Sequence, residues 1–219
     1  MKVIITGSTG MVGKGALLEC LDSSAVEAVV SVTRTSVGIQ HPKLTEVLLS
    51  DISQIGTEDH PWQEYDACFY CMGVSSAGMK EDAYHQITYT MTERFAETLQ
   101  KANPEMTFLY VSGMGTDSTE QGRSMWARVK GKIENRLLGM GFGHAYMFRP
   151  GAIIPERGIR SRTPMYNLML TIMRPFFPLM RRSKSVTTTS KLGQAMIQVA
   201  KQQPQDGVFE AKAINAVLN

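Results

Sequence analysis

The chain has 219 residues, of which 43% are hydrophobic and 20% charged, and its formal net charge is +3. This length suits one well-packed domain, and the composition is that of an ordinary globular protein rather than a disordered or fibrous one. The small net charge gives no support for nucleic acid as a partner, and no apolar run reaches the length of a stable membrane span.

Apolar, β-branched stretches alternate with helical patterns along the chain. Strands are predicted at residues 2–6, 26–33, 45–49, 66–71, 107–112, 144–148 and near 208–211. Helices are predicted at about 11–22, 83–102, 124–139, 164–180 and 190–202. This alternation predicts a single doubly wound, Rossmann-type α/β domain over residues 1–219, with a mainly parallel sheet and a small helical C-terminal cap at 156–184. Ligands of such folds bind beyond the carboxyl ends of the strands, so we examined the segments that follow each strand.

The first predicted strand runs straight into a glycine turn, Gly7-x-x-Gly10-x-x-Gly13, and a helical pattern follows at once. This context is typical of a dinucleotide-binding βαβ unit. Gly7 is expected to turn the chain sharply, Gly10 to let the backbone approach a pyrophosphate, and Gly13 to let the helix pack close to the sheet. The first amides of the helix would then face the phosphates. The alternative is an ordinary strand-to-helix turn with spare glycines.

The segment after the second strand reads Thr33-Arg34-Thr35. An acidic residue about twenty positions beyond the glycine turn would bind the ribose 2′-hydroxyl of NAD, whereas a guanidinium with flanking hydroxyls suits a 2′-phosphate. Arg34 and Thr35 therefore predict NADP(H) as the cofactor. The alternative is that Arg34 is a solvated surface residue.

The segments after the third and fourth strands offer further cofactor contacts. Asp51 and Ile52 are candidates to cap the adenine, although Asp51 is as well suited to capping the next turn. Met72 and Gly73 follow the fourth strand, where a glycine lets the chain pass close to the middle of the cofactor.

Three cysteines, Cys20, Cys68 and Cys71, lie in or beside predicted elements. An odd number in such places indicates reduced, mostly buried thiols of a cytoplasmic protein rather than a disulfide framework. Cys68 and Cys71 fall in one strand, where alternation sends their side chains to opposite faces, and no second Cys/His pair has zinc spacing. We therefore expect no metal site.

The first residues enter a core strand directly, so no signal peptide is expected.

The chain resembles the atypical short-chain dehydrogenases/reductases, and within them the Tat-interacting-protein-like and NAD(P)-binding epimerase-like group. The matching motifs are Thr6 to Gly13, Ser112 after the fifth strand, Lys130 on the next helix, Val129 to Glu134, and the Phe148-Arg149-Pro150-Gly151 turn. The resemblance covers residues 2–155 well and the tail loosely. It implies that Thr9, Met11, Val12, Lys130, Pro150 and Gly151 contact the cofactor in addition to the residues named above.

In that superfamily a Tyr-x-x-x-Lys pair carries the chemistry, because a spacing of four puts both side chains on one face of a helix. The tyrosine exchanges a proton, and the lysine lowers the pKa of that tyrosine and holds the nicotinamide ribose. The resemblance therefore implies Ser112 and Lys130 as catalytic residues. Trp126, however, occupies the tyrosine position, and Gly113 occupies a position where related sequences often carry a serine. An indole has no acid–base function near neutral pH, and Trp126 is equally suited to be a core or lid aromatic.

Three interpretations follow from the missing tyrosine. Another acid, such as Tyr84, Tyr166, His85 or a water, supplies the proton; or the reaction needs little acid catalysis; or the protein binds NADPH without turnover. The favoured function is an NADP(H)-dependent oxidoreductase acting on a small apolar-to-amphipathic organic substrate. The alternative is a non-catalytic NADPH-binding regulatory or sensor protein that acts through protein partners.

Residues 156–184 combine seven basic residues and one acid, a local charge of +6, with methionines and aromatics. The basic residues are Arg157, Arg160, Arg162, Arg174, Arg181, Arg182 and Lys184. This cap is expected to form the wall of a small-molecule substrate pocket. Two alternatives are a helix packed on the sheet with solvated arginines, and peripheral membrane contact, against which Pro175 and Pro178 argue as helix breakers. The oligomeric state is expected to be a monomer or a homodimer.

Overall fold

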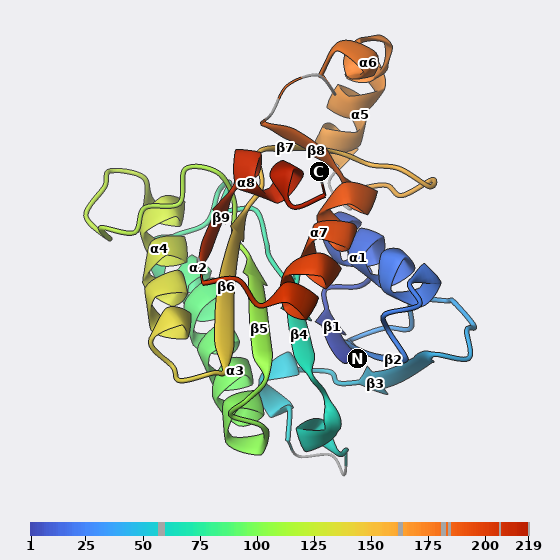
Figure 1. Ribbon diagram of the computed structural model, residues 1–219. Coiled ribbons are helices and arrows are strands. Elements are labelled where there is room, and N and C mark those ends of the chain that lie inside the picture. The colour runs from blue at the N-terminus through green and yellow to red at the C-terminus, as the bar shows by residue number, and fades with distance from the viewer. Residues whose placement is uncertain (57–59, 162–163, 181–182, 184, 206, 219) are drawn as a thin grey trace.

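The computed structural model describes residues 1–56, 60–161, 164–180, 183, 185–205 and 207–218. A seven-stranded sheet forms its centre, and each neighbouring pair of strands is parallel (Figure 1). The strands, in order across the sheet, are β3 (Leu44–Leu48), β2 (Ala28–Thr33), β1 (Lys2–Thr6), β4 (Ala67–Tyr70), β5 (Thr107–Val111), β6 (His144–Arg149) and β9 (Val208–Glu210). The strand order reverses between β1 and β4, which is the switch point where such sheets bind ligands. The predicted doubly wound parallel fold is confirmed.

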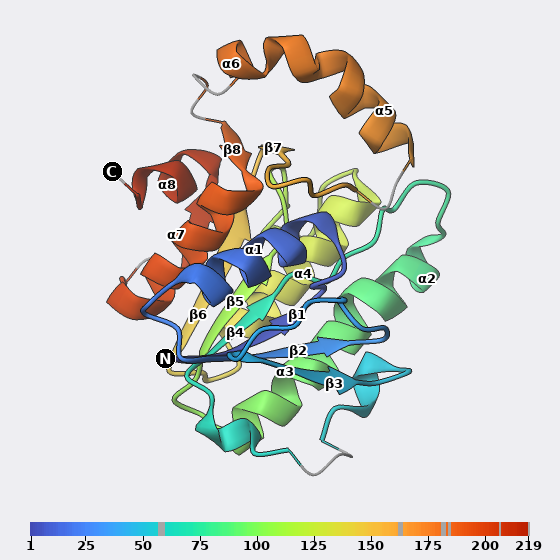
Figure 2. The ribbon, with the colours of Figure 1, turned by 90° about the vertical axis from the view of Figure 1, so that its right-hand side faces the viewer.

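Helices cover both faces of the sheet (Figures 1 and 2). One face carries α1 (Met11–Asp22), α7 (Thr189–Gln202) and α8 (Ala211–Ala216), and the other carries α2 (Glu81–His85), α3 (Met91–Ala102) and α4 (Met125–Leu138). Each face has its own apolar core: Val3 and Ile5 of β1 pack in one, and Ile4 packs in the other. Both sides of the central strands are buried, which explains why these strands are nearly continuous apolar runs.

The cysteines follow the same alternation. Cys68 lies in the core beneath α3, whereas Cys71 packs against the core beneath α1. The prediction that their side chains face opposite sides is confirmed. Burial raises the pKa of the Cys71 thiol to about 12, so this thiol stays protonated at neutral pH.

Helices α1 and α7 approach each other closely through two glycines that the sequence analysis did not single out. A Cβ on Gly15 would lie 2.7 Å from Cβ of Thr189, and a Cβ on Gly193 would lie 3.0 Å from Cα of Ala16. Beside them, the Gln194 amide donates to a carboxylate oxygen of Glu19 at 2.8 Å. The two helices therefore form one close-packed layer behind the glycine turn.

Three details differ from the sequence-based prediction. A second, two-stranded parallel sheet joins β7 (Ala152–Ile154) to β8 (Val186–Thr188), and α8 follows β9 directly. The helix expected at 83–102 contains a π-helical turn at Gln86–Thr90, between α2 and α3. The helix expected at 164–180 consists of α5 (Pro164–Met173), a 3-10 turn η4 (Arg174–Phe176) and α6 (Phe177–Met180). Strands of three residues carry too little periodicity to be predicted from sequence.

Candidate functional site

The glycine turn lies at the carboxyl end of β1 and has the geometry of a close backbone crossing. Gly7 has a φ of +68°, and a Cβ there would lie 2.6 Å from the carbonyl oxygen of Cys71 after β4. The Gly10 amide closes the turn by donating to the Gly7 carbonyl at 2.8 Å. A Cβ on Gly13 would overlap that same carbonyl. Gly13 therefore packs α1 closely against the turn that directly follows β1.

Gly10 differs from the other two glycines because its open side is not filled by protein. A Cβ there would meet only the Gly7 carbonyl oxygen, at 3.2 Å. Gly10 is also the N-cap of α1, whose first turn carries no acidic residue and no side-chain cap. The first amides of the helix are thus left to bind something else, as in helix N-termini that bind phosphate. Thr9, Met11 and Val12 flank this position and are half-buried.

A buried pair of hydroxyls holds the turn to the neighbouring strand. The Oγ atoms of Ser8 in the turn and Ser31 in β2 lie 2.6 Å apart, and both residues are fully buried. This contact was not predicted from the sequence. Its signal was Ser31, a polar residue that interrupts the apolar run of β2 and needs a buried partner.

Arg34 and Thr35 follow β2 and are both exposed. Among the described residues, no ion pair engages Arg34, so its guanidinium is available to an anion. The Thr33 hydroxyl donates to the Thr35 carbonyl at 3.0 Å and shapes this corner. Asp51 is exposed as well, but the Ile52 side chain is 5% exposed and lies in the core beneath α3. Of Ile52, only the backbone remains available for the expected adenine contact.

The segments after β4 and β6 differ in accessibility. Met72 is half-buried, and Gly73 is exposed with no atom within 4 Å of a built Cβ. Pro150 is buried, and its carbonyl accepts from the Met114 amide at 2.9 Å. A Cβ on Gly151 would overlap the Ser185 carbonyl before β8. Gly151 is therefore required for the close approach of these two segments, a role that the sequence analysis did not foresee.

Lys130 and Ser112 are brought together as expected. The Lys130 Nζ atom of α4 donates to the backbone carbonyl of Ser112 at 2.5 Å. The Ser112 hydroxyl in turn donates to the Phe148 carbonyl at 3.2 Å, which ties β5 to β6. Burial lowers the pKa of Lys130 to about 8, although the nearby carboxylate of Glu134 acts in the opposite direction. A lysine with such a pKa exchanges its proton near neutral pH.

Trp126 lies one turn before Lys130 on α4 and is half-buried. The edge of its indole ring would lie 3.5 Å from a Cβ on Gly115, so the ring covers the loop after β5. Gly113 in the same loop has no atom within 4 Å of a built Cβ. The loop therefore has room for a side chain at the position where related sequences often carry a serine.

The other proton donors considered from the sequence are engaged or covered. Tyr84 is 1% exposed, and burial raises its pKa. Tyr166 of α5 donates to the Ile153 carbonyl of β7 at 3.4 Å, and burial raises its pKa too. His85 stacks on Tyr89 with ring centroids 4.7 Å apart. Burial thus makes Tyr84 and Tyr166 weaker acids than exposed tyrosines, whereas it lowers the pKa of Lys130.

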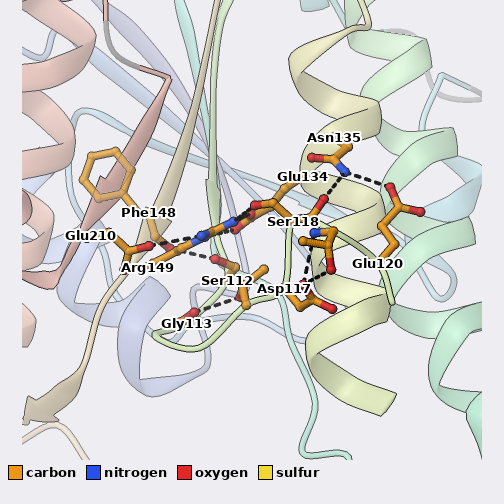
Figure 3. Close-up of polar contacts among 12 residues, drawn as sticks. Ser112, Gly113, Asp117, Ser118, Glu120, Glu134, Asn135, Phe148, Arg149 and Glu210 are labelled. Atoms are coloured by element: carbon orange, nitrogen blue, oxygen red, sulfur yellow. Dashed lines mark hydrogen bonds and ion pairs between the residues drawn. The ribbon is translucent and has the colours of Figure 1, made fainter. Parts of the chain in front are cut away.

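A buried arginine holds α4 and its loop in place (Figure 3). Arg149 at the end of β6 donates from Nε to both carboxylate oxygens of Glu134, at 3.2 and 3.1 Å, and pairs with it again through Nη2. Its other contacts are Glu210 of β9 at 3.0 Å and the Ser118 hydroxyl at 2.5 Å. Arg149 and Glu134 are 8% and 1% exposed. The arginine therefore joins β6, β9, α4 and the loop after β5, with Glu134 one turn beyond Lys130.

The cap is described only in part. Arg162, Arg181, Arg182 and Lys184 lie outside the described residues. Arg157 pairs with Glu19 at 3.3 Å and with Asp22 at 2.8 Å, so it belongs to the α1 side of the molecule.

Comparisons with known proteins find relatives in sequence and neighbours in structure. No family model matches the chain. The protein FMP52-1, mitochondrial, of Scheffersomyces stipitis is 28% identical over 181 residues, 80% of this chain and 76% of that protein. The protein HTATIP2 of Rattus norvegicus is 24% identical over 157 residues, 71% of this chain and 64% of that protein.

Solved structures show the same fold at low sequence identity. ADP-L-glycero-D-manno-heptose-6-epimerase of Helicobacter pylori superposes with a TM-score of 0.68 at 16% identity, covering 95% of this chain and 76% of that one. A short-chain dehydrogenase of Burkholderia cenocepacia in complex with NADP gives 0.67 at 11%, covering 99% and 92%. The fold is that of the short-chain dehydrogenases/reductases and epimerases. Within this class, the resemblance to the atypical group that includes the Tat-interacting protein is confirmed.

One expectation is contradicted by these relatives. The chain was expected to be cytoplasmic, but several of its relatives, among them those of Scheffersomyces stipitis and Debaryomyces hansenii, are named as mitochondrial proteins. The expectation was wrong because it rested on buried, reduced thiols. These thiols report on the folded core and not on targeting, which is specified by segments separate from the fold.

Proposed function

We propose that the protein binds NADP(H) at the carboxyl edge of the sheet and uses it to reduce or oxidise a small, apolar-to-amphipathic organic substrate. The observation that carries this proposal is the pairing of two features at that edge. One is the glycine turn, with open space at Gly10 and an uncapped helix behind it. The other is Lys130, held by the Ser112 carbonyl with a pKa of about 8.

The residues present fit a dinucleotide phosphate. The first amides of α1 and the free side of Gly10 favour the pyrophosphate, because the helix N-terminus attracts negative charge and no Cβ intervenes. Arg34 favours NADP(H) over NAD(H), since it is exposed, follows β2 and offers a charge-assisted contact to a 2′-phosphate. The complexes of similar folds with NADP and NAD⁺ support a nicotinamide dinucleotide without choosing between the two.

The bound nicotinamide would supply or accept the hydride. The chain's own task is to move the proton that accompanies it, and Trp126 is unable to do so. Lys130 takes this role in our proposal: in reduction, its Nζ atom gives a proton to the substrate oxygen, and in oxidation it takes that proton back. Ser112 acts as a positioning residue. Its carbonyl accepts a hydrogen bond from Lys130 Nζ, and its hydroxyl donates one to the Phe148 carbonyl of β6.

The experiment is a survey of NADPH consumption with aldehydes, ketones and enones, using the wild type, Lys130→Met and Lys132→Met. Lys132 is the matched control, since it lies on the same helix with its Nζ 5.1 Å from the centre of the Tyr89 ring. Loss of the proton donor is expected to lower kcat about 10²–10⁴-fold in Lys130→Met, while Lys132→Met keeps its rate. Tight NADPH binding without turnover of any substrate would contradict an oxidoreductase and favour the regulatory alternative.

A further inference from the structure

Residues 164–180, here called the arm, are mostly apolar although they do not lie in the protein core. Only Asn167, Thr171 and Arg174 in this stretch are polar residues. None of the arm side chains whose burial is described is buried, and Leu168, Ile172, Phe176 and Leu179 are 55–65% exposed. Figures 1 and 2 show α5 and α6 standing beyond the main body of the molecule. Contiguous exposed apolar surface of this kind marks an interaction site.

The arm has two apolar sides with different surroundings. At about 100° per residue, Tyr166, Leu170, Met173, Phe177 and Met180 fall on one side, and all five are half-buried. Tyr166 ties this side to β7 through the Ile153 carbonyl. Leu168, Ile172, Phe176 and Leu179 follow one another at spacings of four, four and three, which places them together on another side. Tyr166 thus ties the half-buried side to the protein at β7, and the stripe of four exposed residues is open to solvent.

The prolines do not interrupt the arm. α5, η4 and α6 follow one another without a break from 164 to 180, with Pro175 in the first turn of η4 and Pro178 in the first turn of α6. Proline is tolerated in the first turn of a helix because the amide it lacks has no intrahelical partner there. The α-helix thus ends at Met173, before Pro175, but the helical path of the backbone continues through η4 and α6 to Met180.

Basic residues border the apolar stripe. Arg174 lies on the polar flank of the arm, and Arg160 precedes it; both are exposed, and no ion pair engages either among the residues that the structure describes. The sequence adds Arg162, Arg181, Arg182 and Lys184 immediately before and after the arm. Exposed leucine, isoleucine and phenylalanine bordered by arginine and lysine have the composition of helices that lie in the headgroup region of anionic membranes.

We propose that the arm docks onto an anionic lipid surface, with Leu168, Ile172, Phe176 and Leu179 inserted among the acyl chains and Arg160 and Arg174 on the headgroups. The arm would lie in the interface and not cross it, since no helix among the described residues is long and apolar enough to span a bilayer. A second copy of the chain is the less favoured occupant, because it would bring two segments of charge +6 together. The inference is independent of cofactor binding and turnover.

The test is co-sedimentation with vesicles of phosphatidylcholine, with and without phosphatidylglycerol. The wild type should bind the anionic vesicles at least about tenfold more tightly than the neutral ones, and added salt should weaken this binding. A variant with Leu168, Ile172, Phe176 and Leu179 all changed to serine should lose at least about tenfold in affinity. The matched control carries Leu48→Ser and Leu138→Ser, two residues that are also exposed but lie elsewhere, and should bind as the wild type does.

A second variant reports on insertion directly. Phe176→Trp places a fluorescent ring in the stripe, and brominated lipids should quench its emission in anionic vesicles. Equal binding to neutral vesicles, unchanged binding of the serine variant, or no bromine quenching would each overturn the proposal. So would a wild-type dimer in solution that the serine variant converts to a monomer, because the stripe would then be covered by a second copy. Circular dichroism of the same variants shows whether they remain folded, and NADPH titration tests the proposed function separately.

Discussion

The glycine turn and the first turns of helix α4 both lie at the carboxyl edge of the sheet (Figure 1), but the turn depends on absent side chains and α4 on present ones. In the turn the missing side chains matter: Gly7 and Gly13 leave room for backbone, and Gly10 leaves room for a ligand. In α4 the side chains matter: Lys130 contacts the Ser112 carbonyl, Trp126 covers the loop after β5, and Glu134 pairs with Arg149. The shape of the glycine turn is kept as long as its glycines are kept. A side-chain site changes with one substitution, so an intact glycine turn is compatible with an indole at the position where the resembling superfamily carries its tyrosine.

The largest expected effect is a loss of NADPH affinity at the glycine turn while the fold stays intact. Gly10→Val should lower NADPH affinity beyond about hundredfold, because its branched side chain would occupy the space proposed for the pyrophosphate. Its melting temperature should change little, since Gly10 has an extended backbone and a Cβ there meets only one carbonyl oxygen. Isothermal titration and a thermal melt measure the two quantities.

Gly13→Ala is the matched control for that prediction. Its Cβ would overlap the Gly7 carbonyl, so this variant should lose about 1–3 kcal/mol of stability together with binding. If Gly10→Val kept its NADPH affinity, the turn would be an ordinary strand-to-helix connection.

The next largest effect is expected from variants that place hydroxyl groups beside Lys130. Trp126→Tyr would place a phenol four residues before Lys130, the arrangement of the resembling superfamily, and should raise carbonyl reduction above the rate that Lys130 alone supports. Gly113→Ser adds the hydroxyl that related sequences often carry, in open space but at a φ of 158° that costs some loop stability. The two changes should be more than additive because they act on one transition state. Steady-state rates of the single and double variants test this, and no gain in the double variant would show that proton transfer is not what the site lacks.

The third effect concerns what holds α4 in place. Arg149→Met leaves the buried carboxylate of Glu134 without its cation, and should lower the free energy of unfolding by about 3–5 kcal/mol. Arg149→Met combined with Glu134→Leu should cost less than the sum of the two single changes. Arg136→Met is the exposed control, since its pairs with Glu93 and Glu97 lie at the surface and should contribute at most about 1 kcal/mol. Urea unfolding of the four variants provides the measurement.

The same contrast explains what the sequence was able to predict. The glycine turn was found from spacing alone, because three glycines between a strand and a helix leave few other structures. The Arg149 cluster was not found, since its members come from β6, β9, α4 and a loop and meet only once the sheet is assembled. The Ser8–Ser31 contact is of the same kind, although an isolated serine in the apolar β2 strand hinted at it. The β7–β8 pair was missed because each strand is short and its partner is distant in the sequence.

A smaller effect distinguishes the two cofactors. The wild type should bind NADPH at least about tenfold more tightly than NADH, a difference of about 1.4 kcal/mol that we assign to Arg34 and the 2′-phosphate. Arg34→Ala should remove this preference and leave NADH affinity unchanged, whereas Arg94→Ala on the exposed surface of α3 should change neither. Equal affinities in the wild type would show that Arg34 is only a solvated surface residue.

The smallest expected effect is the pH dependence of reduction, which tests the protonation of Lys130. If Nζ donates the proton, kcat/KM should fall as the pH rises through about 8 and should be halved near that value, because only the ammonium form donates. Glu134 acts to raise this pKa, so Glu134→Gln should move the midpoint to lower pH. Stability should run in the opposite direction: the unfolded chain keeps its lysine proton up to about 10.5, and stability should therefore increase between about pH 8 and 10.5. A rate that stays flat to pH 10 would remove Lys130 as the proton donor and return that role to a water or to a reaction that needs no acid.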